Sequence, residues 1–384
     1  MKRTLYGQDH EDFRGMIRAF IAAKVSPHRE EWAEHGTPRE LFLWLGELGV
    51  LGFDIPEQYG GPGPTSYKYQ AVVLEEAARA HVHLGHYAVT TGVVLPYLVR
   101  LAELDQAARW FPGIVRGEIC LSIAMTEPGT GSDLAGIRTT ARLSADGTHY
   151  LLNGAKTFIT GVRNSELCVV VARTGALDAA DRRAGLSLLV VATDSPGFEI
   201  GRKLAKLGEA AIDVSELSFT DVRVPVENLL GQEGQGFRYL GQNLPRERLA
   251  IAVNAVSSAT AAIDLALAYT QQRTVFGQPV AAFQNTKFVL AGCATEVAAA
   301  QALVDKAIEL DETGELTGAD AAKVKLFASE VAGRVIDACL QLHGGYGYVL
   351  EYPIARLYAD TRVTRIYGGT SEVMKTIIAK DLGL

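Results

Sequence analysis

The spacing of apolar residues changes twice along this 384-residue chain. From about residue 9 to 116, apolar side chains recur at the three-to-four-residue spacing of amphipathic helices. Between 120 and 230 the pattern becomes short β-rich runs separated by Gly, Asp, Asn and Pro. Beyond Phe237, three long Ala-rich segments joined by short turns predict an antiparallel helical bundle. We therefore expect an α+β protein with an N-terminal helical domain (1–119), a middle β-barrel domain (120–231) and a C-terminal four-helix bundle (232–384).

The composition excludes several functional classes. Hydrophobic residues make up 48% of the chain, which is ample for domains of this size. The net charge of −7 is spread without a basic patch, so nucleic-acid binding is not expected. Cys120, Cys168, Cys293 and Cys339 are far apart, which argues against a disulfide framework and a zinc site. With no apolar leader and no run of membrane-spanning length, we expect a cytoplasmic protein without a membrane span.

One loop has the composition of a ligand-binding turn. Residues 125–133 read Met-Thr-Glu-Pro-Gly-Thr-Gly-Ser-Asp, and their backbone N–H groups and hydroxyls could hold an anionic or polar ring system. Alone, such a loop is more often an ordinary turn. The glycines of 231–236 match no dinucleotide fingerprint, because no helix-opening Gly-x-Gly-x-x-Gly follows a strand there. A Rossmann domain is therefore not predicted.

Several further segments follow that loop in a fixed order. They are Asn153–Thr160, Arg273–Gly277, Phe283–Gln284, Gln341–Gly345 and Ile366–Glu372. Together with the loop, they resemble the acyl-CoA dehydrogenase family from about residue 10 to the C-terminus. Each segment is weak by itself, and their joint occurrence carries the resemblance.

The resemblance implies non-covalent FAD, with the middle domain against the isoalloxazine and a neighbouring subunit along the pyrophosphate and adenosine. Thr126 and Thr160 are the expected hydroxyl donors, and the Arg273 guanidinium suits phosphate oxygens, although it could also be a helix-surface cation. The family commonly has Trp beside the flavin, whereas this chain has Phe158, and that departure resembles the long-chain branch. The implied cofactor contacts are Ile123, Met125, Thr126, Gly131, Ser132, Phe158, Ile159, Thr160, Arg273, Phe276, Gln284, Gln341, Gly344, Gly345, Thr370 and Glu372.

The family often keeps its catalytic carboxylate in the tail turn, where this chain has Gly368. Glu247 is the candidate replacement, because it shares a predicted helix face with the apolar Leu244 and Ile251. Desolvation on that face would raise its pKa toward neutrality, as suits a general base. The alternative is that residues 246–248 form a solvated charge cluster. The long-chain and isovaleryl-CoA branches resemble this chain in pairing a helix-borne Glu with a small residue in the turn.

The resemblance thus implies α,β-desaturation of a fatty or branched acyl-CoA. Glu247 would take the α-proton, flavin N5 would accept the β-hydride, and the backbone N–H of Gly368 would stabilise the enolate oxygen. Substrate contacts are implied for Ser132, Arg248 and Gly369; Arg248 could instead orient the site or pack as an ordinary surface Arg. An electron-transfer flavoprotein is the implied acceptor in β-oxidation, and the implied assembly is a homotetramer.

Three other interpretations stay open. The chain could be an acyl-thioester oxidase or a biosynthetic dehydrogenase for carrier-protein thioesters. It could also be a non-catalytic, flavin-binding family member that has lost the tail carboxylate.

Three histidines, His81, His83 and His86, superficially suggest a metal, but no carboxylate joins them at ligand spacing, so no metal is expected.

Overall fold

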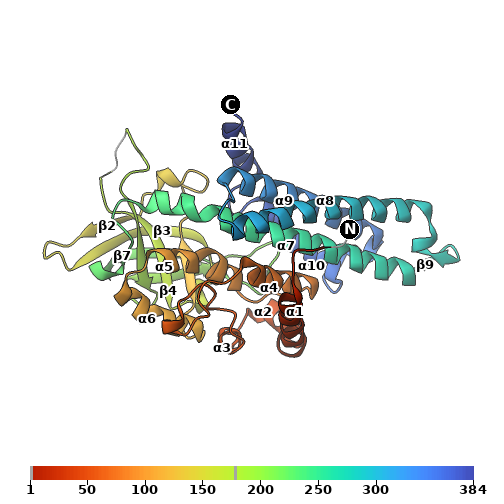
Figure 1. Cartoon of the computed structure of the whole chain (residues 1–384), viewed down its shortest axis with the longest axis horizontal. Coiled ribbons are helices and arrows are strands. Elements are labelled where there is room, and N and C mark those ends of the chain that lie inside the picture. The colour runs from red at the N-terminus through yellow and green to blue at the C-terminus, as the bar shows by residue number, and fades with distance from the viewer. Residues whose placement is uncertain (1–2, 177–179) are drawn as a thin grey trace.

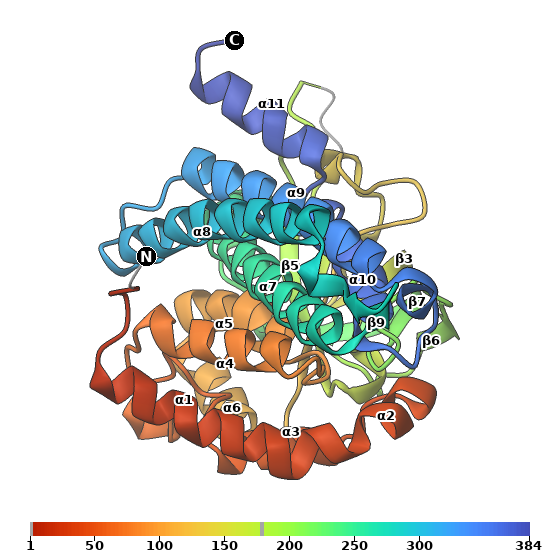
Figure 2. The same cartoon turned by 90° about the vertical axis from the view of Figure 1, so that its right-hand side faces the viewer.

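The structure, a computed structural model, describes residues 3–176 and 180–384. Helices from the start of the chain lie below, a β-rich part lies at one end, and a long helical bundle extends away from it (Figure 1). The end-on view in Figure 2 shows α7, α8 and α9 stacked above the N-terminal helices, with α11 projecting outward. The order of helical, β-rich and helical parts is the one predicted from the sequence.

The N-terminal part consists of helices whose apolar faces point toward the bundle and the sheet. Ile17 of the first helix and Ile21 directly after it are almost completely buried, as their spacing predicts. Two short π-helical stretches, Ile21–Val25 and Ala88–Val94, interrupt the regular helices. The α-helices are α1 (Gln8–Phe20), α2 (Arg29–His35), α3 (Glu40–Glu47), α4 (Tyr67–Arg79), α5 (Leu95–Leu101) and α6 (Leu104–Val115).

The middle part is an eight-stranded mixed sheet with the order β6-β7-β3-β2-β4-β5-β8, in which β1 pairs with β4. The β1–β4 pair is parallel, whereas β3–β7 and β4–β5 are antiparallel. Strands β4 and β5 are buried almost throughout, because helices cover one side and the rest of the sheet covers the other. The strands are β1 (Leu121–Ala124), β2 (Thr140–Leu143), β3 (His149–Thr160), β4 (Leu167–Arg173), β5 (Leu186–Ala192), β6 (Phe198–Lys203), β7 (Val214–Pro225) and β8 (Leu229–Leu230).

The C-terminal part is built on three long helices. Small residues on the α7 stripe, such as Ala252, Ala255 and Ala259, are completely buried and let α7 approach α9 closely. The shorter α10 packs against α9 and α7, and α11 packs against α9. The elements are α7 (Gly236–Gln272), β9 (Thr274–Val275), β10 (Gln278–Pro279), α8 (Gln284–Glu312), α9 (Gly318–Leu342), α10 (Pro353–Thr361) and α11 (Ser371–Asp381).

The prediction that no segment reaches membrane-spanning length is wrong by length and composition. Helices α7 and α8 are both long and apolar enough to cross a membrane. Most of the apolar window of α7 is buried inside the protein, whereas that of α8 is largely exposed on this chain. The sequence estimate failed because both helices are rich in alanine and have few charged residues over long windows, which makes them apolar without long runs of large hydrophobic residues.

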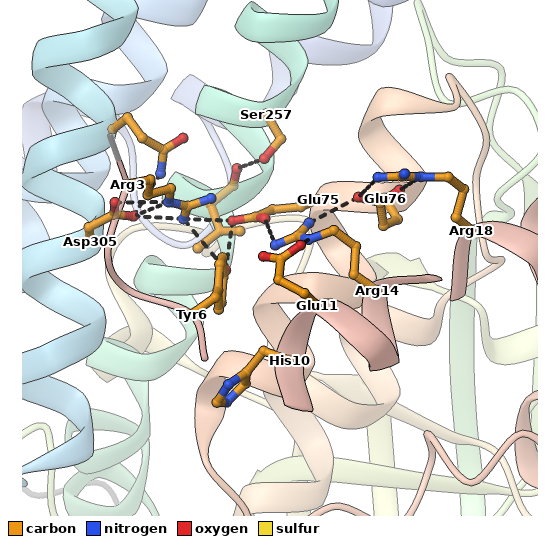
Figure 3. A network of polar contacts seen from close by, with 12 residues as sticks. Arg3, Tyr6, His10, Glu11, Arg14, Arg18, Glu75, Glu76, Ser257 and Asp305 are labelled. Atoms are coloured by element: carbon orange, nitrogen blue, oxygen red, sulfur yellow. Dashed lines mark hydrogen bonds and ion pairs between the residues drawn. The ribbon is translucent and has the colours of Figure 1, made fainter. Parts of the chain in front are cut away.

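Charged side chains tie the start of the chain to α4 and α8 (Figure 3). Arg14 of α1 lies 2.9 Å from a carboxylate oxygen of Glu75 and 2.9 Å from one of Glu76, both on α4. Arg3 bridges Glu75 at 2.7 Å and Asp305 of α8 at 2.6 Å. Arg14, Glu75 and Glu76 are buried, so the removal of one partner would leave an uncompensated charge in the interior. The network therefore fixes the N-terminal helices to α4, which itself packs on α7.

Candidate active site

Glu247 lies on α7 and faces the turn that contains Gly368. A Cβ atom at Gly368 would lie 3.7 Å from Oε1 of Glu247, so the carboxylate occupies the space beside position 368 that a side chain there would enter. Oε2 of Glu247 is buried and has no hydrogen-bond partner in the described part of the chain. Arg248 is also buried. Residues 247 and 248 are therefore interior groups, and the alternative of a solvated charge cluster does not hold for them.

The surroundings of Glu247 stabilise the neutral carboxyl more than water does. Burial raises the pKa of its carboxyl to about 7, and the positive charges of Arg248 and Lys325 limit the rise. Two phenols, the buried Tyr97 of α5 and the partly buried Tyr367 of the turn, lie close enough for the charge of Glu247 to raise their pKa further beyond the effect of burial. Glu247 can thus exchange a proton near neutral pH, as a general base must.

The turn at Gly368 and Gly369 is held in a conformation that favours glycine. Their φ angles are +64° and +98°, and a Cβ atom at Gly368 would lie 2.4 Å from Cδ1 of Ile251. Two cations hold the turn from opposite helices: Nε of Arg248 donates to the Gly368 carbonyl at 3.2 Å, and Nζ of Lys325 donates to the Gly369 carbonyl at 2.7 Å. Thr370 then caps α11 by accepting from the N–H of Val373. The site therefore combines a buried carboxylate with a rigid backbone turn.

Sequence reasoning missed Lys325. It lies on the buried stripe of α9, between Ala321 and Ala328, and its side chain is completely buried. The spacing of that stripe was a usable signal, because a charged residue on an Ala-rich face was the same pattern that singled out Glu247.

A second set of predicted residues lies at the loop that follows β1. Nζ of Lys156 donates to the Met125 carbonyl at 2.9 Å and to Glu127 at 3.0 Å. Glu127 in turn accepts from the backbone N–H groups of residues 138 and 139. The Thr157 N–H donates to the Thr126 carbonyl at 2.9 Å. These buried bonds fix the loop against β3, while Gly131 and Ser132 farther along it are exposed.

Phe158 stands out on β3. Its φ is +60°, its side chain is 65% exposed, and the pairing of β3 with β7 shifts register between residues 156 and 159. A bulky residue at positive φ is strained, so the surrounding structure must hold it there. Thr160 lies two residues on and is partly exposed, whereas Ile159 and Ile123 turn their side chains into the core. Only the main chain of those two isoleucines could face a ligand.

A third set of predicted residues lies at the other end of the bundle. Arg273 directly follows α7, and its guanidinium lies 5.8 Å from the ring centre of Tyr346. Phe276 in the turn between β9 and β10 is 96% exposed with φ +49°. Tyr269 stacks on His343 with ring centres 4.4 Å apart, which brings the end of α9 to the end of α7. We call Arg273, Phe276, Gln284, Gln341, Gly344 and Gly345 the distal set.

Within a single chain, the fold keeps the distal set far from Phe158. The β9 end of the bundle and the strands β2, β3 and β7 lie at opposite ends of the molecule (Figure 1). Thr370 and Glu372 instead follow the Gly368–Gly369 turn directly, and Glu372 is exposed at the start of α11. The described residues thus form two separated groups of candidate contacts.

Comparison with known proteins identifies the family. Models of the acyl-CoA dehydrogenase N-terminal, middle and C-terminal domains match residues 7–118, 122–222 and 234–383. The chain belongs to the acyl-CoA dehydrogenase family. It is 42% identical over 381 residues to the long-chain specific acyl-CoA dehydrogenase, mitochondrial, of Sus scrofa, an alignment that covers 99% of this chain and 88% of the relative. It resembles the crystal structure of acyl-CoA dehydrogenase from Geobacillus kaustophilus with a TM-score of 0.95 and 42% identity, covering 99% of each chain. Acryloyl-CoA reductase (NADH) of Anaerotignum propionicum is 35% identical, over 100% of this chain and 97% of the relative.

Acyl-CoA dehydrogenases bind FAD, and the residues of this chain fit that cofactor. The strained and exposed Phe158 presents an aromatic surface, with the Thr160 hydroxyl on the same strand. The loop 125–133, which Lys156 fixes from inside the sheet, presents its exposed glycines and hydroxyls to solvent. When bound there, FAD supplies the redox chemistry of the family.

The histidines singled out in the sequence have different surroundings. His83 pairs with Asp360 of α10 at 3.0 Å, whereas burial lowers the pKa of His86 to about 3. In the described ranges, 3–176 and 180–384, no group of three or more His, Cys, Asp or Glu could hold a metal ion. All four cysteines are buried and free.

Proposed function

We propose that this acyl-CoA dehydrogenase family member desaturates a fatty or branched acyl-CoA between its α and β carbons, with Glu247 as the base. One observation carries the proposal: the Glu247 carboxylate lies where a side chain at position 368 would reach, 3.7 Å from the Cβ position. A carboxylate on α7 can therefore reach the same reacting carbon as a carboxylate on the turn. Its pKa of about 7 suits removal of an α-proton at neutral pH.

Each residue of the site has its own role in this proposal. Glu247 takes the α-proton, and the N–H of Gly368 donates to the developing enolate oxygen. Arg248 is an orienting group, because its guanidinium is buried and donates to the Gly368 carbonyl. Ser132 and Gly369 contact the acyl-CoA, and bound FAD supplies the acceptor for the β-hydride.

We further propose that a second copy of the chain completes each FAD site, within a homotetramer. The support is the separation of the distal set from Phe158 by the length of the bundle, although both sets are exposed and carry groups suited to FAD. Arg273, Gln284 and the Gln341–Gly345 segment would then contact the pyrophosphate and adenosine of a neighbour's FAD. Light scattering of the yellow protein tests this, and a stable FAD-loaded monomer would contradict it.

The test of the proposed reaction is an anaerobic titration of the FAD-loaded protein with saturated acyl-CoAs of increasing chain length and branching. We expect a subset to bleach the visible flavin absorbance, which identifies both the reaction and the substrate class. If no acyl-CoA changes the spectrum but a carrier-bound acyl group does, the carrier-linked alternative is correct. If neither does, the non-catalytic alternative is correct.

The electron acceptor is tested with the reduced protein from the same titration. We propose electron-transfer flavoprotein as the acceptor, in cytoplasmic fatty-acid β-oxidation. Reoxidation should be fast with electron-transfer flavoprotein and slow in air. Rapid hydrogen peroxide formation would favour an oxidase, and NADH-dependent reduction of an enoyl-CoA would favour the activity named for the acryloyl-CoA reductase.

The pH dependence follows from the raised pKa of Glu247. Because the base acts in its ionised form, kcat/KM should rise with pH through an apparent pKa of about 7 and then level off. Steady-state rates between pH 5.5 and 8.5, with a non-sticky slow substrate, measure this limb. A profile without a rise in that range would contradict the assignment of Glu247.

A further inference from the structure

Lys325 is one of the largest completely buried side chains of the protein. Lysine is rarely found in that state, because the ammonium group loses its hydration. In the described part of the chain, the one hydrogen bond of Nζ goes to the Gly369 carbonyl, at 2.7 Å. Burial accordingly lowers the pKa of Lys325 to about 8, so the side chain is still charged at neutral pH.

The charged groups around Lys325 do not neutralise it by direct pairing. Glu330 accepts from Arg365 and from Ser371, and Glu372 is exposed. Arg248 adds a second positive charge nearby, which lowers the pKa of Lys325 further. Glu247 is the remaining carboxylate of the group, and the Lys325 charge acts on it in turn. A buried cation that donates to a backbone carbonyl, and whose charge also acts on a base, is an unusual arrangement for stability alone.

The two cations act on consecutive peptide groups. Arg248 holds the Gly368 carbonyl from α7, and Lys325 holds the Gly369 carbonyl from α9. Peptide groups are planar, so fixing these carbonyls also orients the N–H groups of Gly369 and Thr370. The N–H of Gly368 lies in the preceding peptide group, and the bond from Arg248 restrains it by anchoring the carbonyl side of the same residue. Glycines at positive φ have no side chain to hold such a turn in place, which leaves the restraint to its partners.

We infer that Lys325 is a positioning residue of the reaction: its ammonium group fixes the Gly368–Gly369 turn and keeps the Glu247 carboxylate ionisable beside it. This inference rests on the proposed function. The groups that set the proton affinity of Glu247 are then Arg248 and Lys325 as cations, with Tyr97 and Tyr367 as neutral phenols. Loss of the Lys325 charge should raise the proton affinity of Glu247, so that this carboxyl stays protonated to a higher pH. Loss of the Lys325 hydrogen bond should loosen the turn that carries the proposed oxyanion donor.

The test compares Lys325→Met, which removes both charge and donor, with Lys325→Gln, which removes the charge and keeps a donor. In both variants the acid limb of kcat/KM should move up by about one pH unit. In Lys325→Met, kcat above that limb should fall by roughly 10- to 100-fold, with a smaller fall in Lys325→Gln. Lys323→Met is the matched control, because Lys323 is only partly buried on the same helix and pairs with Asp381 at the surface, so it should leave the profile unchanged.

A second measurement does not depend on turnover. The infrared difference spectrum between the protein and its Glu247→Gln variant isolates the protonated carboxyl band of Glu247, and its titration midpoint should be higher in the Lys325→Gln background. An unchanged midpoint together with kcat within twofold of wild type would overturn the inference. If Lys325→Met does not fold, Lys325→Gln decides on the same criteria. A fully active Glu247→Gln enzyme would instead refute the proposed base, whatever the Lys325 variants do.

Discussion

Replacing Glu247 with glutamine should lower kcat by about 10³-fold, in the range typical for loss of a general base. The amide has nearly the shape of the carboxyl, so its place beside the Gly368 turn should persist. It cannot accept the α-proton, because it has no basic oxygen near neutral pH. Stopped-flow mixing with an acyl-CoA that bleaches the wild-type flavin should leave the variant's flavin oxidised. Its visible spectrum before mixing should match the wild type, since Glu247 is not a predicted FAD contact.

Two further variants sharpen the Glu247 result. Glu247→Asp keeps a carboxylate but withdraws it by one methylene, so it should retain a measurable part of the activity, with a lower kcat than wild type. Glu118→Gln changes an exposed carboxylate that pairs with Arg116 at the surface and should leave kcat unchanged. Wild-type turnover in Glu247→Gln would rule out Glu247 as the base and revive the search for another group.

Replacing Arg14 with alanine should produce the largest loss of stability, about 3–5 kcal/mol in the free energy of unfolding. Arg14 is buried between Glu75 and Glu76 of α4, and each carboxylate lies 2.9 Å from its guanidinium. Arg18 would still pair with Glu76, and Arg3 with Glu75, but both carboxylates would keep part of their charge uncompensated in the interior. Denaturant unfolding at fixed protein concentration, followed by circular dichroism, measures the difference.

The surface pair of Arg116 and Glu118 supplies the control for that measurement. Arg116→Ala breaks an ion pair whose side chains are more than half exposed, so it should cost less than about 1 kcal/mol. Equal losses in the two variants would show that burial of the network adds nothing.

The network should also make stability depend on pH. Burial opposes ionisation of Glu76, but hydrogen bonds and charges from Arg18 and Arg14 outweigh it, so its pKa lies below 4.5. A lowered carboxyl pKa contributes stability above the unfolded value, and that contribution is lost as pH falls below it. Wild type should therefore lose stability more steeply than Arg14→Ala on acidification below about pH 4.5.

The order of elements could be predicted from the sequence, because local periodicity decides it. The Ala-rich stripes of α7 and α9 and the apolar runs of β4 and β5 are patterns of near neighbours in the chain. Glu247 was a candidate on the same grounds, as a carboxylate on an apolar helix face, but that pattern left a solvated charge cluster open. The resemblance to the long-chain and isovaleryl-CoA branches decided in favour of the base. The resemblance in the tail turn directed attention to Gly368, and the structure brings these two residues together although they lie 121 positions apart.

Only the tertiary structure decided what holds the site. Lys325 and Arg248 meet carbonyls of the turn because α9 and α7 pack side by side, and no spacing along the chain encodes which carbonyl a buried cation will reach. The positive φ of Phe158 arises from a register shift between β3 and β7, which long-range pairing imposes. Sequence patterns report which face of an element is apolar, whereas the partners of a buried polar group depend on how distant elements pack against one another.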